Sequence, residues 1–280
     1  MIVVTAAGGP TGTAVVRELR ARGESVRAVV NRRAPRPELL ALGAEVVVGE
    51  LTQPIAWSKV LSGADALYLI WPNFDPDEAE GAPALFAEAR RARLPRVVYH
   101  SVLRPQLRDM PHHAAKDRTE EALSTSGLAS WRVLQPCAYA DNLDAQLAEV
   151  RASGVLRSYW GLRTGQSLVY LRDVAEAAAV LLTEDGLDSG TFEAAGPEAL
   201  TAPRIAELVG ERLGTEVVAD DVVPGGEVPT SWAARCRRTM FDHYRAHGFS
   251  GSPRVLTDLL GRPPRTFAEH LADLELTSPA

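Results

Sequence analysis

The chain has 280 residues, of which 46% are hydrophobic and 24% charged, and its net charge is −6 at pH 7. This is the composition of an ordinary globular protein, and the acidic balance opposes binding to nucleic-acid phosphates. The two cysteines fit no metal or disulfide spacing, so no metal site is expected. No apolar run approaches the ~18 residues of a membrane span, and the N-terminus lacks a signal-peptide pattern. We therefore expect a soluble, cytoplasmic protein with no membrane partner, as a monomer or homodimer.

Short apolar runs predict strands at residues 2–6, 26–30, 45–48, 66–70, 96–100 and 131–134, with helices between them at 13–22, 55–61, 78–93 and 116–123. Most of these strands are apolar throughout, which indicates burial on both faces. The alternation predicts an α/β fold with a Rossmann-type, doubly wound parallel sheet. Beyond Asn142 this rhythm stops. We predict a Rossmann domain over residues 1–142 and, over 143–280, a smaller and mainly substrate-binding lobe that returns some elements to the main sheet.

A glycine-rich turn follows the first predicted strand and opens directly into a helix: Ala6-Ala7-Gly8-Gly9-Pro10-Thr11-Gly12. Glycine lets the backbone approach a diphosphate closely, and the helix N-terminus supplies free N–H groups and the positive end of the helix dipole. The order strand, turn, helix, strand predicts a dinucleotide site whose contacts are Gly9, Pro10, Thr11 and Gly12. The alternative is a purely structural turn before a buried helix.

The end of the second predicted strand bears on the choice of cofactor. NAD enzymes usually place a carboxylate there to bind the ribose 2′-hydroxyl, but this chain has Asn31, Arg32 and Arg33. The two guanidinium groups are suited to a 2′-phosphate, so we predict NADP(H) as the cofactor. Two solvated loop arginines are the alternative.

Further motifs occur in order along nearly the whole chain, at residues 4–12, 45–51, 96–102, 110–116, 134–142, 172–177 and 260–267. On these stretches the sequence resembles the NmrA-like group of atypical short-chain dehydrogenases/reductases, relatives of quinone and triphenylmethane-dye reductases. The resemblance implies additional cofactor contacts at Glu50, Leu51, Ile70, Trp71, Pro136 and Tyr139. The family usually has glycine where this chain has Ala6. Because alanine disfavours a positive φ, we expect Ala6 in the β region and the turn slightly shifted.

The resemblance also points to a reaction centre. Typical short-chain dehydrogenases carry Tyr-x-x-x-Lys on one helix face, with a serine at the end of the preceding strand. Here Ser101 and Lys116 keep these places, and His112 stands at the tyrosine position. All three are candidate catalytic residues, and Lys116 is also a candidate contact of the nicotinamide ribose. His112 could donate a proton, hydrogen-bond the substrate or take no part, and Ser101 could instead satisfy backbone groups.

Ligands of such sheets bind at the carboxyl ends of the strands. Trp71 and Tyr139 follow two predicted strands and could form aromatic walls for a flat, conjugated or quinone-like substrate. The leading hypothesis is an NADPH-dependent reductase that delivers hydride to a quinone, imine, enone or aromatic acceptor. The alternatives are a non-catalytic NADP(H)-sensing regulator and a cofactor-assisted isomerase or cyclase.

Overall fold

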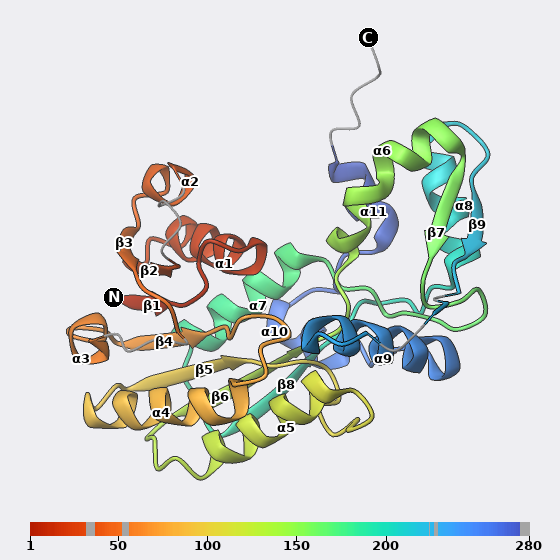
Figure 1. Ribbon diagram of the computed structural model, residues 1–280. Helices are drawn as coiled ribbons and strands as arrows, with labels where there is room; N and C mark the ends of the chain where they lie inside the picture. The colour runs from red at the N-terminus through yellow and green to blue at the C-terminus, as the bar shows by residue number, and fades with distance from the viewer. Residues whose placement is uncertain (32–36, 52–55, 224, 227–228, 275–280) are drawn as a thin grey trace. The chain divides into compact units, whose positions relative to one another are not determined.

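The computed structural model describes residues 1–31, 37–51, 56–223, 225–226 and 229–274. A seven-stranded sheet with the order β3-β2-β1-β4-β5-β6-β8 dominates it (Figure 1). Its strands are β1 (Ile2–Val4), β2 (Val26–Val30), β3 (Glu45–Val48), β4 (Ala66–Leu69), β5 (Arg96–His100), β6 (Trp131–Pro136) and β8 (Gly190–Ala194). All pairings from β3 to β6 are parallel. The strand order reverses between β1 and β4, which confirms the predicted doubly wound sheet.

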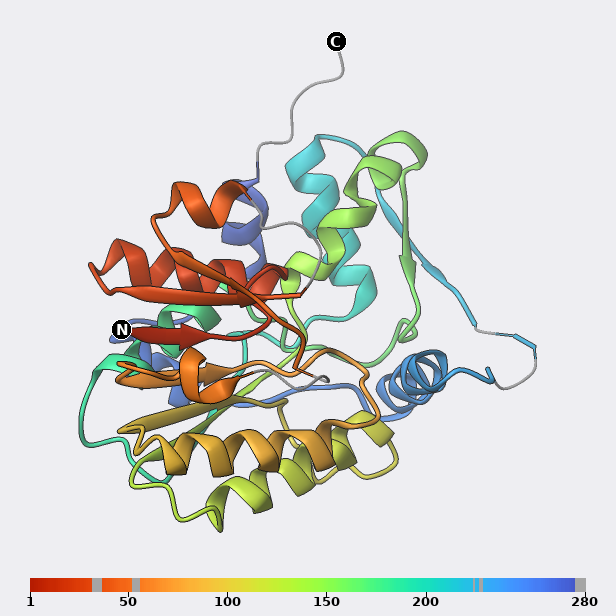
Figure 2. The same ribbon diagram turned by 60° about the vertical axis from the view of Figure 1, so that its left-hand side comes forward.

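The first helices alternate with these strands. They are α1 (Pro10–Ala21), α2 (Pro37–Ala41), α3 (Trp57–Val60), α4 (Glu78–Arg91) and α5 (Pro111–Ser124). Figure 2 shows α1 on one face of the sheet and α4 with α5 on the other. Both α1 and α5 begin earlier than the apolar periodicity predicts, because each starts at a proline, whose fixed φ suits the first helical position.

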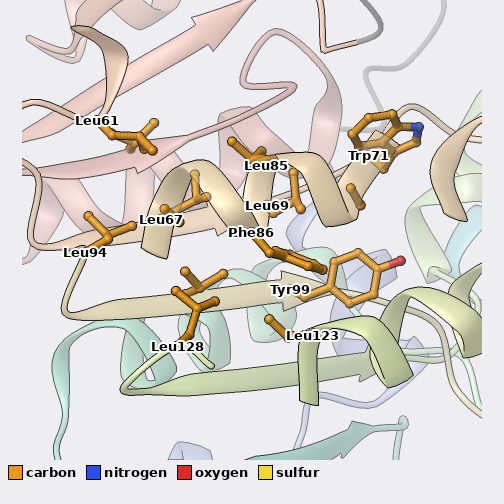
Figure 3. Packing of buried hydrophobic residues seen from close by; sticks show 14 of the residues in the cluster. Leu61, Leu67, Leu69, Trp71, Leu85, Phe86, Leu94, Tyr99, Leu123 and Leu128 are labelled. Atoms are coloured by element: carbon orange, nitrogen blue, oxygen red, sulfur yellow. The ribbon is translucent and has the colours of Figure 1, made fainter. Parts of the chain in front are cut away.

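The core beneath the sheet is built from alternate residues of neighbouring strands and one face of α4 (Figure 3). Leu67 and Leu69 on β4 and Val97 on β5 pack against Leu85 and Phe86 of α4, and all are at most 2% exposed. Burial of each such side chain contributes roughly 1.5–3 kcal/mol. This packing holds β4 and β5 in place, and their carboxyl ends form part of the edge of the sheet at which a ligand would bind.

β3 departs from the expectation of burial on both faces. It forms the edge of the sheet, and Val48 is 47% exposed. An apolar run does not distinguish an edge strand from a central one, because the strand order comes from long-range pairing.

The chain divides into two compact units, Met1–Gln135 with Val174–Phe192, and Pro136–Asp173 with Glu193–Ala280. The chain thus leaves the first unit slightly before the predicted boundary at residue 142, and most of α7 (Leu171–Thr183) belongs to the first unit. No helix of the described residues is long and apolar enough to cross a membrane.

The second unit has its own elements. They are η1 (Ala140–Leu143), α6 (Asp144–Ser153), β7 (Val155–Ser158), α8 (Ala202–Leu213), β9 (Val218–Asp221), α9 (Trp232–His247), α10 (Arg254–Leu260) and α11 (Phe267–Asp273). Strands β7 and β9 form a parallel pair.

The fully buried side chain of Asp173, at the start of α7, connects this helix to residues 262–265. Its carboxylate accepts hydrogen bonds from the Arg262 guanidinium at 2.8 Å and the Arg265 backbone N–H at 2.6 Å, and it also pairs with the Arg265 guanidinium. Such a charge is stable in an interior only when it is paired in this way. The contacts give a structural reason for two of the sequence stretches that carry the resemblance, residues 172–177 and 260–267.

Candidate active site

The glycine turn joins β1 to α1 with a left-handed residue at its start. Ala6 has φ +46°, so the expectation that alanine would keep this position in the β region is wrong. In this conformation the Ala6 carbonyl accepts a hydrogen bond from the Gly9 N–H at 3.0 Å, while the Ala7 N–H donates to Val29 O at 3.0 Å. The first bond closes the turn and the second fixes it to β2, and the strain at Ala6 costs ~1–2 kcal/mol.

The other glycines of the turn serve different purposes. A Cβ on Gly12 would lie 2.5 Å from Ala6 O and 2.6 Å from Ala7 Cα, so only glycine fits where the helix crosses the turn. A Cβ on Gly9 would lie 3.4 Å from Ala6 O, which is an ordinary contact. Gly12 is therefore the packing glycine, and Gly9 caps the helix with an extended backbone at φ −87° and ψ 167°.

The N-terminus of α1 fits a diphosphate. Among the described residues no side chain caps it, and its first turn contains no acidic residue. Because the first N–H groups of a helix have no intrahelical acceptor, those of Thr11 and Gly12 point out of the helix end and are suited to an anion. The predicted contacts from Gly9 to Gly12 thus lie together at the start of one helix.

The ends of β2 and β3 lie side by side. The Gly49 N–H donates to Val30 O at 2.7 Å, which places Glu50 and Leu51 next to the end of β2, where Asn31 is exposed. Arg32 and Arg33, the predicted contacts of a 2′-phosphate, lie outside the described residues.

Thr5, which follows β1, connects the end of β1 to the end of β4. Its hydroxyl donates a hydrogen bond to Ile70 O and accepts one from Ile70 N, both at 2.8 Å. The next residue, Trp71, is 4% exposed and belongs to the core cluster. Its ring occupies the space above Gly81 of α4, where a Cβ would lie 2.4 Å from it. The buried Trp71 Nε1 has no partner among the described residues and is turned away from the leucines in Figure 3. This unpaired N–H at the strand end is suited to a ligand acceptor.

Lys116 projects from α5 into a buried polar cluster at the end of β5. Its ammonium donates to Glu78 Oε1 at 2.8 Å, to His100 O at 3.3 Å and to Tyr99 Oη at 3.5 Å. The ammonium also lies 5.2 Å from the centre of the Tyr99 ring. Glu78 in turn accepts a hydrogen bond from Tyr99 Oη at 2.5 Å. Burial, together with the nearby Glu78 carboxylate, raises the pKa of Tyr99 well above its ordinary value, so its phenol stays protonated.

His112 lies one turn before Lys116 on α5 and is 8% exposed. Its ring meets Phe74 edge to face at 5.0 Å, and its buried Nδ1 has no partner among the described residues. Burial lowers the pKa of His112 to about 3, with smaller contributions from His113 and Lys116. The imidazole is therefore neutral near pH 7, which does not suit a general acid.

Ser101 follows β5, and its hydroxyl hydrogen-bonds the Glu120 carboxylate, to which Gln135 Nε2 also donates at 2.9 Å. Glu120 lies one turn after Lys116 on α5, and burial raises its pKa. Ser101 is thus held within a side-chain network and is 3% exposed. Of the three candidate catalytic residues, Ser101 and His112 are buried, whereas Lys116 is half-buried.

The remaining predicted contacts, Pro136 and Tyr139, belong to the second unit. Pro136 ends β6, and Tyr139 is half-buried and forms an isolated parallel bridge with Val169.

Sequence reasoning missed Glu78, Tyr99 and Glu120. Glu120 could have been found, because its spacing of four residues from Lys116 places it on the same helix face. Glu78 and Tyr99 carry no comparable signal, since they lie 38 and 17 residues from Lys116 and meet it only through the sheet.

A doubly wound parallel sheet with an open, glycine-bounded helix N-terminus at its carboxyl edge defines a dinucleotide-binding protein of the Rossmann class. The chain belongs to the NAD(P)H-binding family, which it matches over residues 6–185.

Several known proteins are similar over the full length. The NAD(P)H azoreductase of Xenophilus azovorans is 26% identical over 283 residues, covering 96% of each chain. The structure of a Citrobacter sp. triphenylmethane reductase complexed with NADP(H) superposes with a TM-score of 0.84 at 23% identity, covering 97% of this chain and 99% of that one. The NADPH-dependent quinone oxidoreductase of Escherichia coli, complexed with NADPH, gives a TM-score of 0.83 at 23% identity with the same coverage. Likenesses at these identities establish the fold.

Proposed function

We propose that the protein is an NADPH-dependent reductase that transfers hydride to a conjugated small molecule, such as an azo compound, a quinone or a triphenylmethane dye. The observation that carries this proposal is the N-terminus of α1 at the carboxyl edge of the sheet, which no described side chain caps and whose first turn contains no acidic residue. The acceptor classes follow the names of three similar proteins, an azoreductase, a quinone oxidoreductase and a triphenylmethane reductase.

When bound, the cofactor supplies the hydride, and the protein binds and orients the partners. The N–H groups of Thr11 and Gly12 would bind the diphosphate, and Lys116 the nicotinamide ribose. Hydride acceptors of this kind become protonated on oxygen or nitrogen, which exchange protons with water, or are cations that need no proton. A neutral His112 is compatible with this chemistry, because no side chain has to deliver a proton.

Selection of NADPH over NADH rests on Arg32 and Arg33. A charge-assisted hydrogen bond to a phosphate contributes ~1.5–3 kcal/mol, a factor of roughly 10 to 100 in affinity. Replacing both arginines by alanine should remove most of the preference for NADPH, measured by quenching of tryptophan fluorescence. Equal affinities of the native protein for NADPH and NADH would refute this assignment.

The reductase proposal is tested by following NADPH absorbance with a panel of azo dyes, quinones and triphenylmethane dyes. We expect turnover with at least one acceptor class. In the Lys116→Met variant we expect the KM for NADPH to rise by about 10-fold or more, because a charged hydrogen bond is lost. A matched control is Lys59→Met, on α3, which should behave like the native protein.

A non-catalytic NADP(H) sensor is a second candidate, favoured by the engagement of Ser101 with Glu120 and by the low pKa of His112, about 3. The same panel separates the two. NADPH binding without turnover of any acceptor would favour the sensor.

A further inference from the structure

The contacts of Lys116 differ in strength. Its bond to Glu78 at 2.8 Å is short, whereas those to His100 O at 3.3 Å and Tyr99 Oη at 3.5 Å are at the long end of the hydrogen-bond range. An ammonium has three N–H donors. A ligand hydroxyl could therefore replace a long contact while the bond to Glu78 remains.

Glu78 is well placed to hold that ammonium. Its side chain is 4% exposed, and it begins α4, where the helix dipole favours a negative charge. Tyr99 Oη donates to the same carboxylate oxygen at 2.5 Å, which leaves the carboxylate little freedom to move. In Figure 3 the Tyr99 hydroxyl points away from the core at the end of β5. The carboxylate is thus fixed from two sides.

The alternative is that this ion pair only joins α4 to α5. The two helices already contact one another, and buried ion pairs contribute little net stability compared with an apolar pair of similar volume. The lysine side chain is flexible, so an ammonium that must meet a ligand at one point needs a fixed partner.

We propose that Glu78 is the positioning residue of Lys116, holding its ammonium at the end of β5 in the place where it meets the nicotinamide ribose. This rests on the proposed function, since it assumes that the chain binds NADP(H). Tyr99 supports Glu78 through its hydroxyl and Lys116 through its ring.

The test compares the Kd of NADPH with that of the adenosine half of the cofactor, which retains the 2′-phosphate and lacks the nicotinamide ribose. In Glu78→Gln we expect the Kd of NADPH to rise by about 10-fold, the effect of one charge-assisted hydrogen bond, and the Kd of the fragment to stay unchanged. In the Lys116→Met background, Glu78→Gln should have no further effect. Tyr99→Phe, which keeps the ring, should raise the Kd of NADPH by a few-fold.

Asp188→Asn is the matched control. It neutralises the partner of the buried Arg132, which lies far along the strands from this site. This variant should leave the Kd of NADPH and the Kd of the fragment unchanged. An unchanged or lower Kd of NADPH in Glu78→Gln, or equal losses for NADPH and the fragment, would overturn the positioning role while leaving the proposed function intact. If the native protein binds neither NADPH nor the fragment, the proposed function itself fails.

Discussion

Two residues, Ala6 and Gly12, determine the conformation of the glycine turn. Ala6 adopts φ +46°, a conformation that glycine reaches without strain, and Gly12 has no space for a Cβ. The turn therefore differs from the family pattern in having alanine in place of glycine at residue 6. Its backbone nevertheless adopts the left-handed conformation for which glycine is suited at that position.

Ala6→Gly should relieve this strain. We expect the free energy of unfolding to change by between zero and about +1 kcal/mol, since relief of the left-handed conformation is partly offset by the greater freedom of glycine in the unfolded chain. NADPH affinity should be equal or higher. Gly12→Ala should instead destabilise the protein by about 3 kcal/mol, because its Cβ would meet rigid backbone. Urea unfolding measures both, and a Gly12→Ala variant as stable as the native protein would contradict the packing role.

At the level of elements, Arg132 and Arg96 bind the segment Val174–Phe192, with which the chain returns to the first unit. Arg132 on β6 is fully buried and donates to Leu181 O at 2.5 Å, Glu184 O at 2.7 Å and Asp188 at 2.9 Å. Arg96 on β5 donates to Leu182 O at 2.6 Å. The bonds to Leu181 O and Leu182 O satisfy two of the last carbonyls of α7, which have no partner within the helix.

Arg132→Met should therefore lower the free energy of unfolding by about 3 kcal/mol, because it leaves the buried Leu181 carbonyl and the partly buried Glu184 carbonyl without this donor. Arg91→Met, which removes an exposed arginine of α4, is the control and should change stability by less than ~0.5 kcal/mol. Denaturant titration measures the free energy of unfolding of both variants, and equal effects of the two substitutions would contradict the role of Arg132.

The elements were predictable to different degrees. The sequence predicts the strands from β1 to β6 to within a few residues, because apolar runs between helical patterns are local signals. The start of α5 was missed, since its first turn is polar and only the proline marks it. The contacts of Lys116 with Glu78 and of Arg132 with Asp188 were not predictable, because such partners are brought together by the strand order.

The whole molecule carries a pH dependence that comes from two buried histidines. Burial lowers the pKa values of His100 and His112 to about 3. In the unfolded chain a histidine titrates near ~6.5, so as the pH falls the unfolded state takes up these protons first. The stability due to each neutral histidine is thus fully present above about pH 6.5 and is lost progressively towards about pH 3. Glu120, whose pKa burial raises, acts in the opposite sense.

Between about pH 6 and pH 4 we expect the free energy of unfolding to fall with a slope of up to ~1.4 kcal/mol per pH unit for each of the two histidines. His112→Gln should reduce this slope, whereas His247→Gln, at an exposed position, should not. Urea unfolding at a series of pH values measures it. Stability that is constant or rises towards pH 4 would contradict the burial of these groups as neutral imidazoles.

As a reductase, this chain binds NADPH and passes its hydride directly to a conjugated acceptor. A triphenylmethane dye tests this most directly, because hydride added to its central carbon forms a C–H bond that does not exchange with water. With NADPH deuterated at the transferring position of C4, we expect a leuco dye that is one deuterium heavier, formed more slowly than with ordinary NADPH. A leuco dye without deuterium, or no reduction of this dye or of an azo compound or quinone, would contradict it.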